Sequence, residues 1–220
     1  MSLKRLAAWF WGMAAILAIL LTTVDVMALD TGWYDKWYRQ SDLAEKLDVP
    51  EESIEQAMGM MLEYVKGTRN SMDGSLAGIG EVYNAREKAH MKDVRRLYDR
   101  AMTVKTACWI IVIAGIVLAV WKHSWKTLAL GYLQAGLCWL VLIAFLGLWA
   151  ATGFTDFWTR FHELFFDNDL WLLDPATDFM IRICPEQLFF DLVIRIVLTI
   201  TAVAGAGGIV SWVVWRSGRH

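Results

Sequence analysis

Two histidines, His90 and His162, are the residues best suited to chemistry in this sequence. Histidine titrates near neutral pH, so its ring can take a proton from an amine or a hydroxyl and return it to a leaving group. His162 lies in an aromatic stretch, residues 157–191, which is too polar to cross a bilayer and too apolar to be a solvated loop. Such mixed side chains suit the headgroup layer of a membrane. We interpret the stretch as an active site at a membrane surface, with His162 as its reactive group.

His90 follows Glu87 by three residues, so both side chains project from one side of a predicted helix that continues with Val94 and Leu97. A histidine on an apolar helix face is more often a satisfied core residue than a catalyst. A carboxylate bonded to the far ring nitrogen of either histidine would fix its tautomer. Several other side chains are available to support the histidines: carboxylates such as Glu87, Asp93, Asp167, Asp169 and Asp174, the amide of Asn168, and tyrosines including Tyr64.

No common nucleophile motif accompanies the histidines. The sequence has no Gly-x-Ser-x-Gly or Ser-x-x-Lys pattern, which favours a mechanism in which the substrate supplies both nucleophile and electrophile. Glu87-x-x-His90 with His162 and a carboxylate would make a zinc site, but no His-Glu-x-x-His or Cys-x-x-Cys pattern supports one. We therefore expect no metal and no cofactor. The net charge of -2 indicates no nucleic-acid partner.

The composition is that of a small membrane protein, with 57% hydrophobic residues and 13 tryptophans among 220 residues. The sequence predicts an all-α membrane protein with four transmembrane helices. A mostly helical extracytoplasmic domain is expected between the first and second helices, and the aromatic-rich outer segment between the third and fourth. The four apolar runs cover residues 6–24, 104–121, 128–151 and 189–215, and the predicted domains are residues 1–24, 25–103, 104–151, 152–188 and 189–220.

Helix signals are clearest inside the predicted domain of residues 25–103. Pro50 followed by Glu51 and Glu52 is typical of a first helical turn, because proline fits there and acids favour the positive end of the helix dipole. Apolar residues then recur at helical spacing up to Gly67, which is a reasonable stop. A second helix is predicted to begin near Ile79 and to run into the second apolar segment.

The distribution of basic residues predicts the orientation. Lys4 and Arg5 precede the first apolar run, and the short turn of residues 122–126 between the second and third runs is also basic. Basic short loops stay in the cytoplasm, so we expect cytoplasmic N- and C-termini. His90 and His162 then lie together on the extracytoplasmic side.

The first apolar run has an alternative interpretation as a signal peptide, because Val26 and Ala28 satisfy the small-residue cleavage pattern before Leu29. The run is long for the apolar core of a signal peptide. We therefore favour an uncleaved first transmembrane helix.

Several blocks of sequence together resemble one family. In chain order they are MLEYVKG (residues 61–67), EKAHMKDV (87–94), FHELFFDNDLW (161–171), LDP (173–175) and PEQLFFD (185–191). They are similar to the lipoprotein intramolecular transacylases, small four-span membrane proteins of Gram-positive bacteria known as Lit. The resemblance extends over nearly the whole chain, and the block around His162 is its most specific part.

The resemblance implies an acyltransferase that acts on bacterial lipoproteins, whose N-terminal cysteine carries a diacylglyceryl thioether. The family moves the sn-2 acyl chain from the glycerol to the α-amino group of that cysteine and leaves a lyso-form lipoprotein. By this analogy His162 is the base, and His90 stabilises the oxyanion or relays the proton. Asn168 or Tyr64 would donate to the oxyanion, and Glu87, Asp93 or Asp174 would orient a histidine. The implied partners are the lipoprotein substrate and membrane lipids.

Two other classes of function fit the residues. One is a non-enzymatic membrane sensor or partner subunit whose outer domain binds a lipid or a peptide, and for which both histidines are dispensable. The other is a zinc-dependent lipid or peptide hydrolase, which would be sensitive to chelators.

Overall fold

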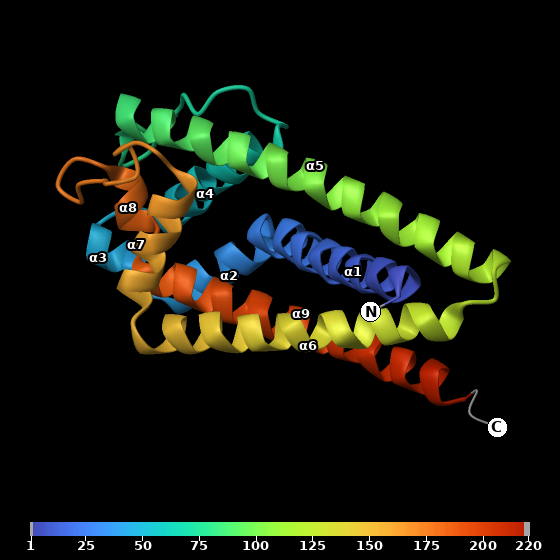
Figure 1. Cartoon of the computed structure of the whole chain (residues 1–220). Helices are drawn as coiled ribbons and strands as arrows, with labels where there is room; N and C mark the ends of the chain where they lie inside the picture. Colours follow the sequence, from blue (N-terminus) through green and yellow to red (C-terminus); the bar gives the residue numbers. More distant parts are fainter. Residues whose placement is uncertain (1, 218–220) are drawn as a thin grey trace. The chain divides into compact units, whose positions relative to one another are not determined.

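The structure, a computed structural model, describes residues 2–217 and is mostly helical (Figure 1). Met1 and residues 218–220, including the end of the predicted cytoplasmic tail, lie outside the described residues. The described elements, in chain order, are α1 (Leu3–Ala28), α2 (Thr31–Gln40), α3 (Leu43–Leu47), α4 (Glu51–Lys66), β1 (Ser75–Leu76), β2 (Gly80–Glu81), α5 (Ala85–Trp121), α6 (Trp125–Thr152), α7 (Phe154–Phe165), α8 (Phe179–Ile183) and α9 (Glu186–Arg216).

Four helices, α1, α5, α6 and α9, are long and apolar enough to cross a membrane. They contain the four apolar runs of the sequence, so the prediction of four membrane helices is confirmed. Each helix is longer than its run because the helical backbone continues into flanking polar residues. In α5 the polar part, residues 85–103, precedes the apolar run and carries His90.

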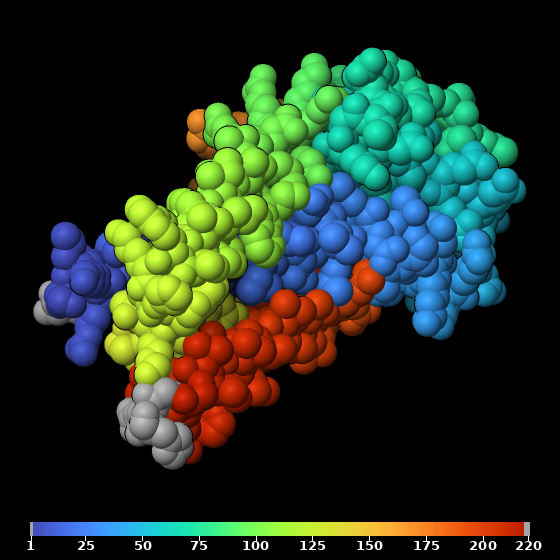
Figure 2. All heavy atoms as spheres, turned by 90° about the vertical axis from the view of Figure 1, so that its right-hand side faces the viewer, coloured from blue at the N-terminus to red at the C-terminus, as the bar shows by residue number. Residues whose placement is uncertain are grey.

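The described chain divides into two compact units, and the first contains most of the apolar helical segments: residues 2–27, 101–152 and 193–217. Many of its large apolar side chains point outward, for example Ile110 (63% exposed) and Val117 (60% exposed). In Figure 2 the yellow-green part of the chain, around residues 110–130, forms part of the surface that faces the viewer. An outward apolar surface is what a helix needs when lipid is its solvent.

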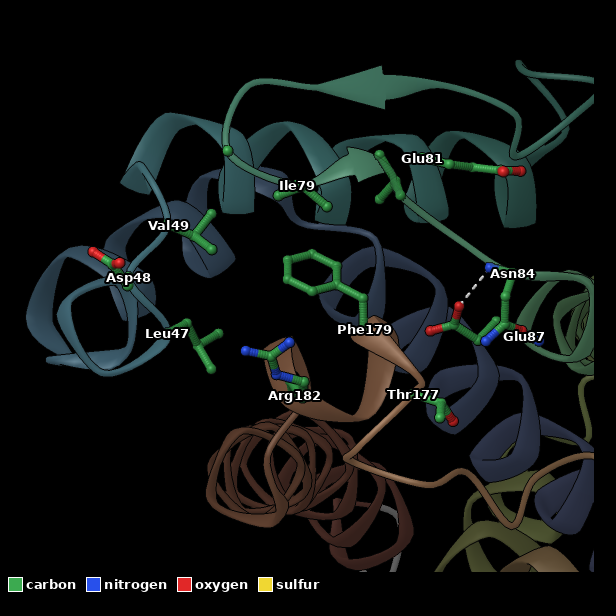
Figure 3. Close-up of a pocket in the computed structure, with 12 residues that line it drawn as sticks. Leu47, Asp48, Val49, Ile79, Glu81, Asn84, Glu87, Thr177, Phe179 and Arg182 are labelled. Atoms are coloured by element: carbon green, nitrogen blue, oxygen red, sulfur yellow. Dashed lines mark hydrogen bonds between the residues drawn. The ribbon is translucent and has the colours of Figure 1, made fainter.

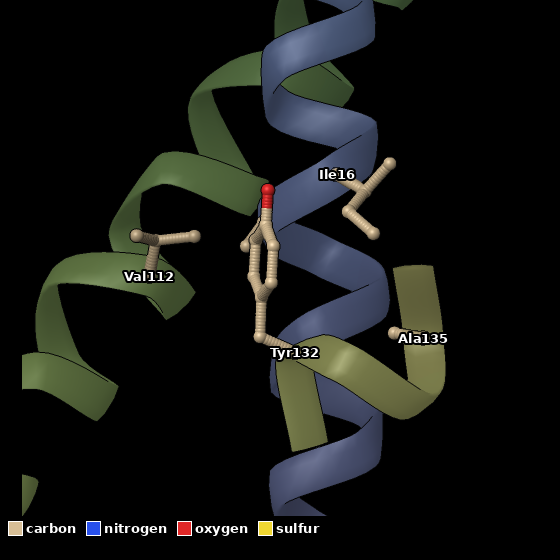
Figure 4. Packing of buried hydrophobic residues seen from close by; sticks show 5 residues of the cluster. Ile16, Val112, Tyr132 and Ala135 are labelled. Carbon is tan, nitrogen blue, oxygen red and sulfur yellow. The ribbon is translucent and has the colours of Figure 1, made fainter. Parts of the chain in front are cut away.

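Inside this first unit, the side chain of Tyr132 on α6 packs with Ile16 of α1, Val112 of α5 and Ala135 (Figure 4). The Tyr132 hydroxyl donates a hydrogen bond of 3.0 Å to the carbonyl oxygen of Ala204 on α9. This bond satisfies the hydroxyl, whose burial without a partner would be costly.

Helices α1 and α6 approach closely at Gly12 and Gly131. A Cβ atom added at Gly131 would lie 2.2 Å from the carbonyl oxygen of Ala8, and one at Gly12 would lie 2.6 Å from the carbonyl oxygen of Gly131. Only glycine leaves room for the two backbones at this distance, which is how small residues allow helices to pack in membranes.

The second unit comprises residues 28–100 and 153–192. Its core includes two fully buried tyrosines whose hydroxyls donate to backbone carbonyls: Tyr38 to Ile183 and Tyr83 to Ala57, both at 2.8 Å. The first bond joins α2 to the end of α8, and the second joins the segment before α5 to α4. The polar groups of this core are thus used to connect segments that are distant in the sequence.

Helix α4 begins at Glu51 behind Pro50 and ends at Lys66, with Gly67 in the left-handed conformation at φ 85°. Both predicted ends are confirmed. The predicted start of the next helix near Ile79 is wrong, because α5 begins at Ala85. The residues before it form the β1–β2 hairpin, in which Leu76 pairs with Gly80. Gly78 and Gly80 have positive φ, which is incompatible with a right-handed helix at these positions.

Candidate active site

The N-terminus of α5 is closed by a capping box. The Asn84 side-chain oxygen accepts from the backbone N–H groups of Arg86 and Glu87 at 2.9 and 3.1 Å, and a Glu87 carboxylate oxygen accepts from the Asn84 N–H at 2.6 Å. This reciprocal arrangement satisfies N–H groups that a helix start leaves without intrahelical partners. His90 lies about one turn after Glu87, on a helix whose N-terminus is stabilised by these hydrogen bonds.

Asn84 and Glu87 also form hydrogen bonds with the segment that contains α8. The second oxygen of Glu87 accepts from the backbone N–H of Met180 at 2.5 Å, and Glu87 is only 1% exposed. Buried Asp178 accepts from the Asn84 side-chain amide at 2.7 Å and from the backbone N–H of Asp174 at 2.7 Å. Burial raises the pKa of Glu87, and the hydrogen bonds from Met180 and Asn84 oppose that rise. Glu87 is thus part of a structural network, and both of its oxygens serve backbone N–H groups.

His162 lies on α7 among aromatic rings. Its ring stacks on Trp171, with centroids 5.0 Å apart, and meets the edge of Trp158 at the same distance. Its Nδ1 atom is 2.7 Å from the backbone carbonyl oxygen of Trp158. A carbonyl oxygen can only accept, so Nδ1 carries the proton and Nε2 has the free lone pair when the ring is neutral. The tautomer of His162 is therefore set by the main chain, and not by any of the predicted carboxylates.

His90 and His162 come together although 72 positions separate them in the sequence, with ring centroids 6.2 Å apart. His90 is 7% exposed and packs against the edge of Phe166, with the two ring centroids at 5.3 Å. Its Nδ1 atom is buried and has no hydrogen-bond partner among residues 2–217. Within that described part of the chain nothing fixes the tautomer of His90, so its proton can sit on either nitrogen.

Burial controls the charge of both rings. The pKa of His90 is lowered to about 4, first by loss of solvation and then by the neighbouring His162, while Asp93 acts in the opposite direction. Burial also lowers the pKa of His162, and the hydrogen bond to the Trp158 carbonyl opposes that change. Both histidines are therefore neutral near pH 7 and can act as proton acceptors.

The other predicted site residues have different neighbours. Asp93 accepts a hydrogen bond of 2.9 Å from the Asn168 side-chain amide and forms an ion pair with Arg96. Tyr64 packs beneath the guanidinium of Arg95, 5.0 Å from the centre of its ring. No ring contact or hydrogen bond in residues 2–217 joins Tyr64 to a histidine.

Asp174 is exposed, and its side chain accepts from the backbone N–H of Ala176 at 2.9 Å, which stabilises a turn. Asn84 and Asp178, which the sequence reasoning missed, form the buried polar network instead. The Asn-x-x-Glu spacing of a capping box was the available signal for Asn84. No sequence signal marked Asp178.

A cavity of about 370 Å³ lies beside Glu87, which is one of its lining residues. Its walls come from the loop after α3, the β2 strand, the start of α5 and the α8 segment (Figure 3). Neither histidine lines it. Among residues 2–217 no group of three or more His, Cys, Asp or Glu side chains is arranged to hold a metal ion.

Four long apolar helices define an integral membrane protein, and a pair of histidine rings lies in its second unit. The chain belongs to the lipoprotein intramolecular transacylase family, because the family model described as Lipoprotein intramolecular transacylase Lit matches residues 9–190. It is therefore a membrane acyltransferase of lipoprotein processing. This result favours the enzyme over a non-enzymatic sensor.

Solved structures of the membrane integral lipoprotein intramolecular transacylase Lit from Bacillus cereus share the fold. One is 20% identical, has a TM-score of 0.80, and covers 97% of this chain and 94% of its own. Two variants of that protein, with a histidine replaced by arginine or by alanine, match at 20% identity with TM-scores of 0.74 and 0.73. They cover 97% and 98% of this chain and 91% and 95% of their own chains. Nothing among the curated proteins matches the chain.

Proposed function

We propose that this enzyme moves the sn-2 acyl chain of a diacylglyceryl-modified lipoprotein to the α-amino group of the N-terminal cysteine, leaving a lyso-form lipoprotein. The membership of the family supports the class of reaction. The observation that carries the catalytic assignment is the pair of neutral histidine rings, 6.2 Å apart, one of which has its tautomer fixed by the main chain.

His162 is the general base in this proposal. Its Nε2 lone pair is available because Nδ1 donates to the Trp158 carbonyl. His90 is poorly suited to the role, because its pKa of about 4 lies roughly four units below the 7.7–8.0 of an α-ammonium group. Proton transfer from the ammonium to His90 would cost about 5 kcal/mol.

His90 acts as the neutral partner. A neutral imidazole can donate a hydrogen bond to the oxyanion without the cost of a buried imidazolium. Because no partner fixes its tautomer within residues 2–217, His90 can also pass a proton to the departing glycerol oxygen. Asp93, whose charge raises the pKa of His90, and Asn168, which donates to Asp93, support it.

The chemical balance is simple. His162 first takes a proton from the α-ammonium group and releases it to water. The free amine nitrogen then attacks the sn-2 ester carbonyl, forms the N–C bond of the amide and gives a second proton to Nε2 of His162. The C–O bond to glycerol then breaks, and the alkoxide receives a proton from the histidine pair. Holding amine and ester within one molecule contributes much of the acceleration, because effective molarities of well-oriented groups reach about 10⁵ M or more.

The orientation is part of the proposal. Basic residues before α1 and in the turn of residues 122–126 support cytoplasmic termini in a bacterial cytoplasmic membrane. The residues of the second unit, which include both histidines, then face the extracytoplasmic side. A reporter that works only in the cytoplasm should be active when it is fused after residue 220. A reporter that works only outside the cytoplasm should be inactive at the same position, and its activity there would contradict this orientation.

The reaction is tested by mass spectrometry of a lipoprotein co-expressed in a host that makes the diacyl form. The wild-type enzyme should move one acyl chain to the cysteine nitrogen, and His162→Gln and His90→Ala should abolish the transfer. His123→Asn is the matched control, since His123 lies in the turn between α5 and α6 with φ 48°, which asparagine tolerates. A diacyl lipoprotein left unchanged by well-expressed wild-type enzyme would refute the proposed reaction, and an active His162→Gln variant would refute the assignment of the base.

A further inference from the structure

The cavity beside Glu87 is polar on several sides, and the mechanism above does not use it. Its walls include Asp48, Asn84, Glu87 and Arg182, together with the ring of Phe179. Its volume of about 370 Å³ is near the lower end of the range for ligand pockets in proteins. Because charged and amide side chains line it, the cavity is suited to a polar occupant rather than to an acyl chain.

Arg182 is the residue that points to a ligand. It lies in the last turn of α8, and Figure 3 shows its guanidinium directed toward the space between Leu47 and Phe179. The guanidinium is 5.9 Å from the centre of the Phe179 ring, and no carboxylate of residues 2–217 forms an ion pair with it. A half-buried guanidinium of this kind retains hydrogen-bond donors for a carbonyl oxygen or an anionic oxygen.

The cavity is connected to His90 by the start of α5. Glu87 and Asn84 precede His90 by three and six residues, which corresponds to about 4.5 and 9 Å along a helix axis. An extended peptide covers about 3.3–3.6 Å per residue. Two or three residues of peptide therefore span the distance from a cysteine held at His90 to the cavity.

We propose that this cavity binds the main chain of the first few residues that follow the acylated cysteine, with Arg182 donating to a peptide carbonyl oxygen. This inference rests on the proposed function, which places the cysteine amine at the histidines. Hydrogen bonds of Glu87, Asn84 and Asp178 join the Met180 segment, which carries Arg182, to the start of α5, which carries His90. The enzyme would then recognise the peptide as well as the lipid.

The test compares two synthetic substrates, a diacylglyceryl-cysteine amide and the same cysteine followed by four residues. For the longer substrate, Arg182→Met should raise KM about tenfold with an unchanged kcat, since a hydrogen bond to a charged group is lost. For the cysteine amide the variant should equal wild type. Arg182→Lys should recover part of the effect, and Arg39→Met, an exposed arginine of α2 paired with Glu55, is the control.

A second arm measures binding alone, with dialkyl-ether analogues of both substrates that cannot transfer an acyl chain. The wild-type Kd should be lower for the longer analogue, and Arg182→Met should remove that difference. Equal Kd values for both analogues in the wild type, or equal effects of Arg182→Met on both, would overturn the inference.

An effect that follows the phosphatidylglycerol content of the vesicles instead of peptide length would also overturn it, in favour of a lipid phosphate. Wild-type enzyme that binds the longer analogue but transfers no acyl chain would refute the proposed function and leave the peptide site supported.

Discussion

Replacement of Glu87 separates a structural role from a catalytic one. In Glu87→Ala two acceptors disappear, so the backbone N–H groups of Asn84 and Met180 lose their partners, while the Asn84 side chain still accepts from the backbone N–H groups of residues 86 and 87. Loss of this half of the capping box costs about 1 kcal/mol and an unsatisfied buried N–H about 1–3 kcal/mol, so the free energy of unfolding should fall by about 2–4 kcal/mol. For a chain of this size we expect a decrease in Tm of about 5–15 °C.

The measurement is thermal unfolding in detergent, followed by tryptophan fluorescence, with acyl transfer assayed well below the melting transition. Glu87→Gln keeps one acceptor oxygen but turns an NH₂ group toward the other N–H, so its Tm should lie between those of wild type and Glu87→Ala. The exposed Glu63→Ala on α4 is the control and should be nearly neutral. At low temperature both Glu87 variants should retain transfer rates within a few-fold of wild type. A Glu87→Gln enzyme with wild-type Tm and a rate reduced a hundredfold would refute this reasoning and make Glu87 a residue that orients a histidine.

Three further results are expected. The pKa of His90 is lowered to about 4 in the folded state from an ordinary 6.5, so the unfolded chain binds the proton first as the pH falls. The contribution of neutral His90 to the free energy of unfolding should be complete above pH 6.5, and about 3 kcal/mol of it should be lost as the pH drops to about 4. A His90→Phe variant should show a flatter profile in pH-dependent unfolding. Gly131→Ala should greatly reduce the yield of folded protein in detergent extracts, because its Cβ would meet a backbone oxygen of α1 at 2.2 Å, whereas Gly205→Ala, with open space around it, should not. A double-mutant cycle of Asp93→Ala and Asn168→Ala should show a coupling energy of about 1–3 kcal/mol in unfolding, and strictly additive effects would contradict the 2.9 Å hydrogen bond.

The four membrane helices and the stop of α4 at Gly67 were predictable, because both depend on local signals: an apolar run of sufficient length, and a residue that adopts positive φ. The β1–β2 hairpin was missed, since strands of two residues are too short to show alternation.

In the candidate site the residue types were predictable, and the partners were not. The contact between His90 and His162 depends on tertiary packing across 72 positions, which spacing does not encode. The sequence predicted only that both histidines lie on the same side of the membrane. Glu87 had a local signal that was overlooked. Its spacing from Asn84 is that of a capping box, but its position three residues before His90 led to the prediction that it orients a histidine.

The carbonyl group that holds His162 belongs to the main chain of Trp158, and every amino acid has the same carbonyl. An alanine scan would remove each carboxylate near the histidines and leave this contact in place, so the scan would not detect the group that selects the tautomer. Sequence variation at position 158 is equally uninformative about it. The contact is sensitive instead to the path of the backbone through α7, and replacement of the Trp158–Thr159 amide by a backbone ester, which weakens the carbonyl as an acceptor, would reveal it without altering any side chain.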